Sequence, residues 1–428
     1  MQYHLEETRK ADPELYELIK LEEERQQNTL EMIASESIQS PQLLEINGCA
    51  FNNKTAVGKP GDMHLLGSQY ADALIALTAK RACELFGAEH ANVQVYSGST
   101  ANYAVYAACL KVGDKVLAMS PSQGGHATHG STRNYTSQVY HFEHYGVDPE
   151  TQLINYDALE KKAMEFRPRL IIAGGSTYSQ FIDFERISQI ARKAEAYFLV
   201  DMAHYTGLVA AGLVPSPVPW ADFVTGSTTK TICGPRSGFI LCKQKYADMI
   251  DDGAYPKIVA SLHLQTMAAM AHAFGYAQTE EFREVMQATV ENADCLAREL
   301  QKRGFNIVSG GTRCHLMVVD MRGQGINGKQ FAKVLEKINL SVNAVDIPYD
   351  TSSVRNGVRI GCTVASQRGM GKKEMAEIAD IIAAVAKAPE DQEVLDSCAK
   401  RVRALCDRFP LYGRFDKLSK ERGEQNAV

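Results

Sequence analysis

Short apolar runs alternate with amphipathic stretches between about residues 90 and 245. Several runs are separated by segments with helical periodicity, such as 158–166 and 187–196. Strands that alternate with helices predict a mainly parallel sheet with helices on both faces. The expected strands are 93–95, 116–119, 139–142, 170–173, 197–200, 223–225 and 239–242.

The pattern changes on either side of this region. Residues 1–30 are rich in charge and predict a helical arm, whereas helical periodicity dominates 263–303. A strand-like run at 316–321, a helix at about 328–338, a strand near 358–360 and a helix at 373–387 follow. We therefore expect three tightly packed parts: an arm over 1–30, a large α/β domain over 31–285 and a smaller α+β domain over 286–428.

Composition narrows the class of protein. The chain has 428 residues, of which 45% are hydrophobic and 23% charged, as in an ordinary globular protein. A net charge of -5 leaves no basic surplus for nucleic acid. The apolar runs are too short to span a membrane, and the charged N-terminus has no apolar signal core, so we expect a cytoplasmic protein. The ten cysteines form no CxxC pair and are expected to be reduced.

Ligands of open α/β sheets bind where strands end, so the residues after each expected strand matter most. The first strand leads into Ser97-Gly98-Ser99-Thr100 and then into a helical run. Small residues at a helix start expose N–H groups that suit a phosphate. A simple helix cap by Ser99 or Thr100 explains the same residues, and this explanation is preferred for the motif alone.

Two further strands end in residues with chemical potential. Asp201 ends the 197–200 run, where its carboxylate would pair with a protonated pyridine or cap a turn. Lys230 follows the 223–225 run among small hydroxyl residues, where burial would make its amine nucleophilic, although a surface lysine is the plainer alternative. A phosphate turn, an aspartate and a lysine in this order are much more specific than any one of them.

Several longer stretches of the chain match sequence motifs of one enzyme family. They are 32–36 (MIASE), 96–99 (YSGS), 101–106 (ANYAVY), 124–126 (GGH), 128–130 (THG), 200–204 (VDMAH), 207–212 (GLVAAG), 215–219 (PSPVP), 307–312 (IVSGGT) and 357–361 (GVRIG). With these stretches the chain resembles the serine hydroxymethyltransferase family over nearly its whole length. The resemblance implies a pyridoxal-5′-phosphate (PLP) enzyme of amino-acid metabolism. It further implies an aspartate-aminotransferase-like large domain (fold type I) with a mainly parallel seven-stranded sheet, and a homodimer, or a pair of dimers, with its active site between subunits.

The resemblance also implies roles for the matching residues. Lys230 would carry PLP as a Schiff base, and Ser35 and Arg359 would hold the substrate carboxylate. An apolar strand around Arg359 makes a surface ion pair a weaker explanation of that residue. The remaining cofactor positions are Ser97, Gly98 and Ser99 at the phosphate, His126 stacked on the ring, Ser176 beside it, Asp201 at the pyridine nitrogen and His204 at the ring hydroxyl. Lys230, His126 and Asp201 are the expected catalytic residues.

The chain departs from the family pattern around the β-carbon and folate positions. Val57 stands where the family has a proton-transferring glutamate, and valine cannot act as an acid or base. The other departures are Thr55 and His64-Leu65 in place of tyrosines, Thr229 in place of a histidine, Ala260-Ser261-Leu262 in place of Gly-Gly-Pro, and an altered loop at 350–356. The resemblance therefore implies that PLP and carboxylate binding are kept while folate chemistry is lost.

These departures favour a folate-independent lyase, in which an aldolase or transaldolase cleaves or forms the Cα–Cβ bond of a β-hydroxy amino acid. An amino-acid racemase or aminotransferase, a folate-dependent transferase with substituted residues, and a non-catalytic PLP-binding protein remain alternatives. His64 is a candidate base or substrate ligand, although a structural or exposed histidine is at least as good an explanation. Arg355 would bind an acidic side chain or be solvated.

Two motifs are set aside. The stretch 323–330 nearly matches a phosphate-binding loop, but it ends in Gln330 where magnesium binding requires serine or threonine. His126 and His129, like His141 and His144, have a spacing that metal sites use. We expect no metal, because no third cluster accompanies them.

Overall fold

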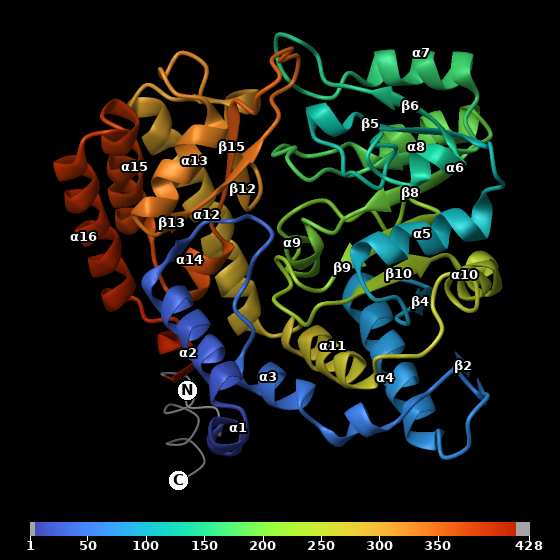
Figure 1. The fold of residues 1–428 in the computed structure, drawn as a ribbon. Coiled ribbons are helices and arrows are strands. Elements are labelled where there is room, and N and C mark those ends of the chain that lie inside the picture. Colours follow the sequence, from blue (N-terminus) through green and yellow to red (C-terminus); the bar gives the residue numbers. More distant parts are fainter. Residues whose placement is uncertain (1–4, 417–428) are drawn as a thin grey trace.

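The computed structural model describes residues 5–416, and its chain forms a larger and a smaller lobe (Figure 1). The larger lobe contains a seven-stranded sheet and the smaller one a four-stranded sheet. Residues 1–4 of the expected arm and 417–428 of the expected C-terminal domain lie outside the described part. No helix within 5–416 is long and apolar enough to cross a membrane.

The large sheet has the strand order β4-β10-β9-β8-β7-β5-β6. Its pairings from β6 through β5, β7 and β8 to β9 are parallel, whereas β10 is antiparallel to both β9 and β4. The strands are β4 (His90–Asn92), β5 (Lys115–Met119), β6 (His141–Tyr145), β7 (Leu170–Ala173), β8 (Tyr197–Asp201), β9 (Phe223–Ser227) and β10 (Gly238–Cys242). The expected mainly parallel sheet of seven strands is confirmed.

Two of the expected strands were misplaced. The apolar run 93–95 follows β4 instead of forming it, because the side chain of Gln94 donates to the carbonyl of Gly58 and its N–H donates to Asn92 Oδ1. These bonds divert the chain away from the sheet although Val93 and Val95 are buried. The run 139–142 begins within the short helix α6 (Thr136–Val139), and β6 starts only at His141. Burial alone therefore misled the strand assignment.

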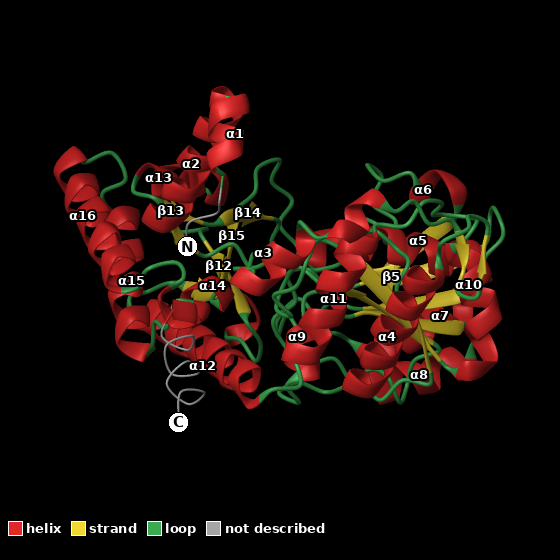
Figure 2. Cartoon of the chain, turned by 90° about the horizontal axis from the view of Figure 1, so that it is seen from below, coloured by secondary structure: helices red, strands yellow, loops and turns green. Residues whose placement is uncertain are grey.

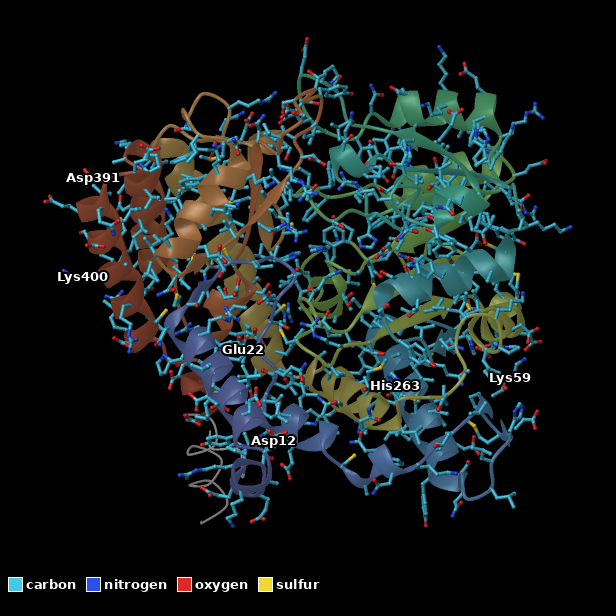
Figure 3. All side chains as sticks on the ribbon, viewed as in Figure 1. Asp12, Glu22, Lys59, His263, Asp391 and Lys400 are labelled. Atoms are coloured by element: carbon cyan, nitrogen blue, oxygen red, sulfur yellow. The ribbon has the colours of Figure 1, made fainter. Side chains whose placement is uncertain are left out.

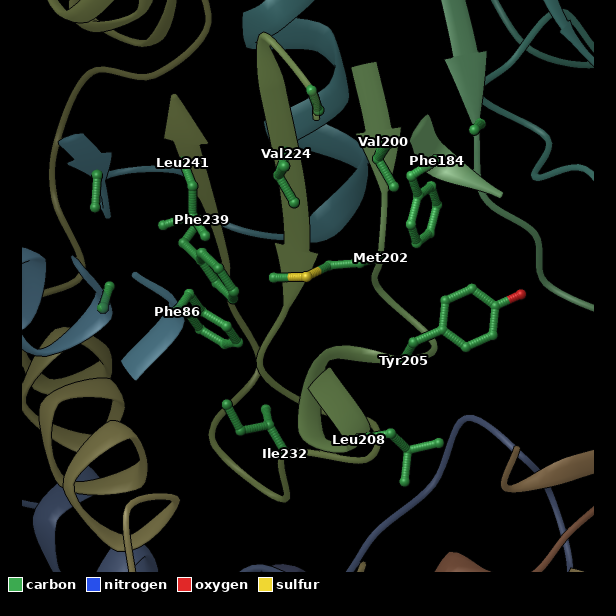
Figure 4. Packing of buried hydrophobic residues seen from close by; sticks show 14 of the residues in the cluster. Phe86, Phe184, Val200, Met202, Tyr205, Leu208, Val224, Ile232, Phe239 and Leu241 are labelled. Carbon is green, nitrogen blue, oxygen red and sulfur yellow. The ribbon is translucent and has the colours of Figure 1, made fainter. Parts of the chain in front are cut away.

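Helices cover both faces of the large sheet, as the cartoon in Figure 2 shows. The helices of the larger lobe are α3 (Pro41–Asn47), α4 (Gln69–Phe86), α5 (Gly98–Cys109), α7 (Tyr156–Phe166), α8 (Phe184–Lys193), α9 (Thr206–Ala210), α10 (Ala247–Ala254) and α11 (Leu264–Tyr276). Between α4, α11 and the sheet, Phe239 packs against Phe86, with ring centroids 5.4 Å apart (Figure 4). Phe239 also packs against Phe274, with ring centroids 5.3 Å apart. Each buried side chain of this size contributes roughly 1.5–3 kcal/mol.

The smaller lobe is an α+β unit. Its antiparallel sheet runs β11 (Asn306–Ile307), β12 (Leu316–Asp320), β15 (Gly357–Gly361) and β14 (Asn343–Val345). The helices are α12 (Glu280–Lys302), α13 (Gly328–Lys337), α14 (Thr363–Gln367), α15 (Lys372–Lys387) and α16 (Gln392–Arg408). Its core also contains Leu30 and Met32, since β1 (Leu30–Glu31) pairs with β13 (Leu340–Ser341). The residue bounds of the three expected parts stay a prediction.

The N-terminal arm consists of α1 (Glu6–Ala11) and α2 (Pro13–Asn28), and α2 packs against α16. The buried guanidinium of Arg368 holds this junction by donating to the carbonyls of Gln27, Thr29, Cys406 and Phe409. Charged side chains cover the outer surfaces, for example Glu22 on α2 and Lys400 on α16 (Figure 3). The arm is thus an integral part of the smaller lobe.

Candidate active site

A cavity of about 190 Å³ opens where β8 and β9 end. All eight residues expected around the cofactor line it, so the structure brings that set together. The lining consists of Ser97, Gly98, Ser99, His126, Gly175, Ser176, Asp201, Ala203, His204, Ser227 and Lys230.

The start of α5 forms one end of the cavity. Ser97 is the N-cap: its Oγ accepts from the N–H of Thr100 at 3.1 Å, and Thr100 Oγ1 accepts from the N–H of Ser97 at 2.7 Å. The cap is therefore Ser97, and not Ser99 or Thr100 as the plainer interpretation had it. The first N–H groups of the helix have no helical acceptor, and the helix dipole adds positive potential, so this end suits a phosphate.

A glycine on the neighbouring strand allows this turn to lie against the sheet. A Cβ added at Gly238 would lie 2.3 Å from the carbonyl oxygen of Ser97, far inside van der Waals contact. Only glycine fits there without moving the turn. The position of the phosphate end of the cavity thus depends on β10 as well as on α5.

Asp201 ends β8, lines the cavity and is buried. Its Oδ2 accepts from Asn102 Nδ2 at 2.9 Å and lies 3.1 Å from His129 Nε2, while its Oδ1 accepts from the N–H of Ala203. Burial alone would raise the pKa of Asp201, but the hydrogen bond from His129 and the nearby cationic groups hold it below its ordinary value. The carboxylate is therefore charged at neutral pH and suits a protonated pyridine nitrogen.

A second layer of side chains orients Asp201, and the sequence interpretation missed its role. His129 Nδ1 lies 2.6 Å from the hydroxyl of Tyr106, and Asn102 Oδ1 accepts from Thr225 Oγ1 at 2.6 Å. Asn102, Tyr106 and His129 fall within stretches that match the family, but nothing in their spacing pointed to Asp201. Only the packing of α5 against the ends of β8 and β9 brings them to it.

His126, His129 and Asp201 also place one ligand atom each within 4.8 Å of one another. Hydrogen bonds already explain this geometry: His126 Nδ1 pairs with Thr128 Oγ1 at 2.7 Å, and His129 bridges Asp201 and Tyr106. The cluster is accounted for as the support of the carboxylate, and we assign it no metal.

Lys230 lies in the turn that follows β9. The turn is closed by two bonds of Thr228, whose carbonyl accepts from the N–H of Gly234 at 2.7 Å and whose Oγ1 donates to the carbonyl of Pro235. The pKa of the Lys230 amine is lowered to about 8, chiefly by burial; Asp201 opposes this shift and Arg359 adds to it. About a tenth of the amine is then neutral at pH 7, and the neutral amine is the nucleophilic form.

The two histidines of the cavity are neutral at neutral pH. Burial lowers the pKa of His126 to about 4, and burial together with Lys230 lowers that of His204 well below its ordinary value. Neutral imidazoles suit the roles expected for them, stacking by His126 and hydrogen bonding by His204. His204 also stacks on the buried His315, with ring centroids 5.5 Å apart.

Arg359 comes from the inner strand β15 of the smaller lobe and contacts Ser176 and His204, two residues that line the cavity. Its Nη1 donates to the carbonyl of Ser176 at 2.7 Å and lies 3.4 Å from His204 Nε2, and its Nε donates to Asn343 Oδ1 at 3.1 Å. Burial lowers its pKa to about 10, so the guanidinium stays charged at neutral pH. It is a buried cation beside the cofactor cavity, as a carboxylate-binding arginine would be.

Ser35 lies in a different cavity from the one expected to hold it. It lines an adjoining space of about 220 Å³ that Thr229, the neighbour of Lys230, also lines. The bond from the N–H of Gly361 to the carbonyl of Met32 holds the segment of Ser35 against β15, the strand of Arg359. The structure thus brings Ser35 near Arg359 and Lys230 without placing it in the cofactor cavity.

His64 does not line the Lys230 cavity of its own chain. It is exposed, its N–H donates to the carbonyl of Val57 at 2.8 Å, and its Nδ1 lies 3.3 Å from the hydroxyl of Tyr255. Val57 forms an isolated β-bridge with Ser261. The altered residues at 57, 64 and 261 therefore gather in one place, apart from the cofactor residues of the same chain.

The lowered pKa of Lys230 predicts how cofactor attachment depends on pH. The neutral amine is the attacking form, so the rate at which PLP attaches to the apoprotein should rise about tenfold per pH unit below the pKa and level off above about pH 8. Stopped-flow absorbance measures this rate between pH 6 and about pH 10.4, which is the ordinary pKa of a lysine side chain. A rate that keeps rising up to that pH would show that burial does not perturb the pKa of this amine.

The site residues fit PLP: the start of α5 suits its phosphate, the charged aspartate its pyridine nitrogen, the neutral histidines its ring, and the buried lysine its aldehyde. They lie at the strand ends of a mainly parallel seven-stranded sheet. Fold and site together define a PLP-dependent enzyme of fold type I. A family model described as serine hydroxymethyltransferase matches residues 8–382 of this chain. The chain belongs to the serine hydroxymethyltransferase family, whose members use PLP, act on amino acids and are generally oligomeric. The expected cofactor and enzyme class are confirmed.

Proposed function

We propose that this enzyme cleaves or forms the Cα–Cβ bond of a β-hydroxy amino acid without folate, with glycine or an alanine-like amino acid as the second product. The proposal rests on one observation. Lys230, Asp201 and Arg359 are assembled around one cavity, while the family glutamate is replaced by Val57, whose apolar side chain cannot transfer a proton. The residue roles that follow are part of this proposal, as are the homodimer and the cytoplasmic location.

Each residue of the site has a separate role in the proposed reaction. Arg359 binds the substrate carboxylate through its planar fork of donors, and the neutral His126 would stack on the cofactor ring. When bound, PLP supplies an electron sink for the pair of electrons released at Cα. Asp201 keeps the pyridine nitrogen protonated and so strengthens that sink. Lys230, whose amine would hold PLP, would supply the proton that Cα takes up after the aldehyde leaves.

The β-hydroxyl must lose its proton as the aldehyde forms, and His64 from a second copy of the chain is our candidate base. Within one chain His64 is exposed and lies outside the cavity, so the role requires a dimer with a shared site. Binding of the substrate side chain is the alternative role for His64. Turnover that is unchanged in His64→Ala would remove the residue from both.

Aldehyde release in the absence of folate tests the proposal. We expect the PLP-loaded enzyme to release aldehyde from at least one of serine, α-methylserine, threonine, allo-threonine and phenylserine, since Cα–Cβ cleavage needs only the residues assembled here. A coupled dehydrogenase assay measures it. Lys245→Ala, an exposed lysine outside the cavity, is the matched control for loss of Lys230.

Two results would contradict the proposal. Saturable, folate-dependent exchange between serine and glycine at the rate usual for the family would show that folate chemistry survives without the glutamate. No aldehyde from any substrate would favour a racemase or aminotransferase, for which the buried amine of Lys230, with its lowered pKa, is a suitable base at Cα–H. Exchange of that hydrogen in heavy water would then identify the reaction.

A further inference from the structure

A cleft of about 770 Å³ lies between the two lobes, next to the cofactor cavity. Gly125 and Ala127 line it, and the residue between them, His126, lines the cofactor cavity. The N–H of Ser176 donates to the carbonyl of Gly124 at 2.7 Å and joins the walls of the two spaces. A molecule bound in the cleft would therefore lie beside the segment that carries His126.

Three cationic side chains from three separate segments line this cleft. Arg133 precedes α6, Lys329 lies in the first turn of α13, and Arg355 lies in the loop before β15. Asp346 is the one acidic residue among the described lining residues. The cleft is thus cationic although the whole chain has a net charge of -5, so the local charge reflects placement and not composition.

These three cationic side chains form no strong ion pairs within the part of the chain that the structure describes. Arg355 Nε lies 3.7 Å from Asp346 Oδ1, and the two side chains are 53% and 55% exposed. An ion pair this long and this exposed contributes at most about 1 kcal/mol. Within residues 5–416, Arg133 and Lys329 form no ion pair. All three groups are available to a bound anion at little energetic cost.

The loop that carries Arg355 is nevertheless well defined. Asn356 Nδ2 donates to Asp350 Oδ2 at 2.8 Å and to Ser352 Oγ at 2.9 Å. The carbonyl of Arg355 accepts from the N–H of Lys329 at 3.1 Å, which ties the loop to the start of α13. The backbone at Arg355 is thus held in place beside Lys329 while its guanidinium remains open to the cleft.

We propose that the cleft binds a carboxylate or phosphate group on the aldehyde half of the substrate, the part joined to Cα through Cβ. The inference rests on the proposed function, because an aldehyde half exists only if the Cα–Cβ bond is the one that breaks. Arg355 supplies a planar pair of donors, and Arg133 and Lys329 add positive charge. The anionic group holds the far end of the substrate while Arg359 holds its amino-acid end.

A pair of substrates that differ in one charge tests the proposal. We expect the enzyme to cleave 4-carboxyphenylserine with a kcat/KM about tenfold higher than 4-carbamoylphenylserine, since a charge-assisted contact is lost with the amide. In Arg355→Gln and Lys329→Gln, kcat/KM should fall for the charged substrate only, so that the kcat/KM values of the two substrates become similar. Lys333→Gln removes an equal charge on the exposed part of α13 outside the cleft and should leave the ratio unchanged. A 4-phosphonomethyl analogue shows whether phosphate or carboxylate is preferred.

Equal kcat/KM for the charged and neutral substrates, or an equal loss of both in Arg355→Gln, would overturn the proposal. Calorimetric titration of the PLP-loaded enzyme with inorganic phosphate tests the cleft without turnover: binding should weaken in Arg355→Gln and not in Lys333→Gln. If no aldehyde is released from any substrate but this phosphate result holds, the proposed function fails and the anion site stands. Arg355-dependent binding of pentaglutamyl tetrahydrofolate that supports serine turnover would instead assign the cleft to folate and overturn the aldehyde-half assignment.

Discussion

Replacement of Lys230 by alanine is expected to abolish covalent retention of PLP and to lower turnover by about 10³-fold or more. Lys230 is the one amine among the described residues that line the cofactor cavity, and burial lowers its pKa to about 8. The variant loses both the covalent link and the group that returns a proton to Cα. Cofactor absorbance after gel filtration and the rate of aldehyde release measure the two effects.

The loss in Lys230→Ala must be separated from damage to the fold. Thermal unfolding of the apoprotein should be little changed, because the turn around Lys230 is closed by Thr228 and Gly234 and not by the lysine itself. Lys245→Ala provides the matched exposed control and should keep full activity. Normal turnover in Lys230→Ala would mean that the chemistry is located elsewhere.

Asp201→Asn is expected to retain covalent PLP on Lys230 but to lower turnover by about 10²- to 10⁴-fold. The amide carries no charge, so it cannot stabilise a protonated pyridine nitrogen, and the electron sink weakens. The hydrogen bonds from Asn102 and His129 to Oδ2 change at the same time, which alters how the side chain is held. Steady-state kinetics and the cofactor absorbance spectrum measure the outcome.

Asp222→Asn is the matched control for this variant. Asp222 lies immediately before β9, at the other end of the strand from Lys230, where its Oδ2 accepts from the N–H of Phe198 at 3.0 Å. Asp222 does not line the cofactor cavity. Loss of its charge should therefore affect the stability of the fold without selectively lowering turnover. Equal activity losses in the two variants would show that Asp201 acts through the fold alone.

The sequence was informative where parallel strands end. Asp201 and Lys230 each follow a buried apolar run, and the ends of parallel strands meet at one edge of the sheet. This geometry is the reason why residues 29 positions apart in the chain were predicted to share a cavity, and the structure places them in it.

The sequence was uninformative where contacts depend on packing between distant elements. The support of Asp201 by His129 and Asn102 and the diversion of the chain at Gln94 follow from long-range hydrogen bonds that no local period encodes. The cationic cleft is a further case, since Arg133 and Arg355 are more than 200 residues apart and meet only when the two lobes pack together.

The shared core of the arm and the smaller lobe has a consequence for the order of events on the ribosome. The large sheet uses strands from one continuous stretch, 90–242, and can assemble while the rest is still being translated. The core of the smaller lobe joins Leu30 and Met32 to Val402 and Leu405, and Arg368 binds carbonyls from both regions. Apolar residues near the start of the chain must therefore wait for those near position 400, and during that interval they are natural targets for chaperones.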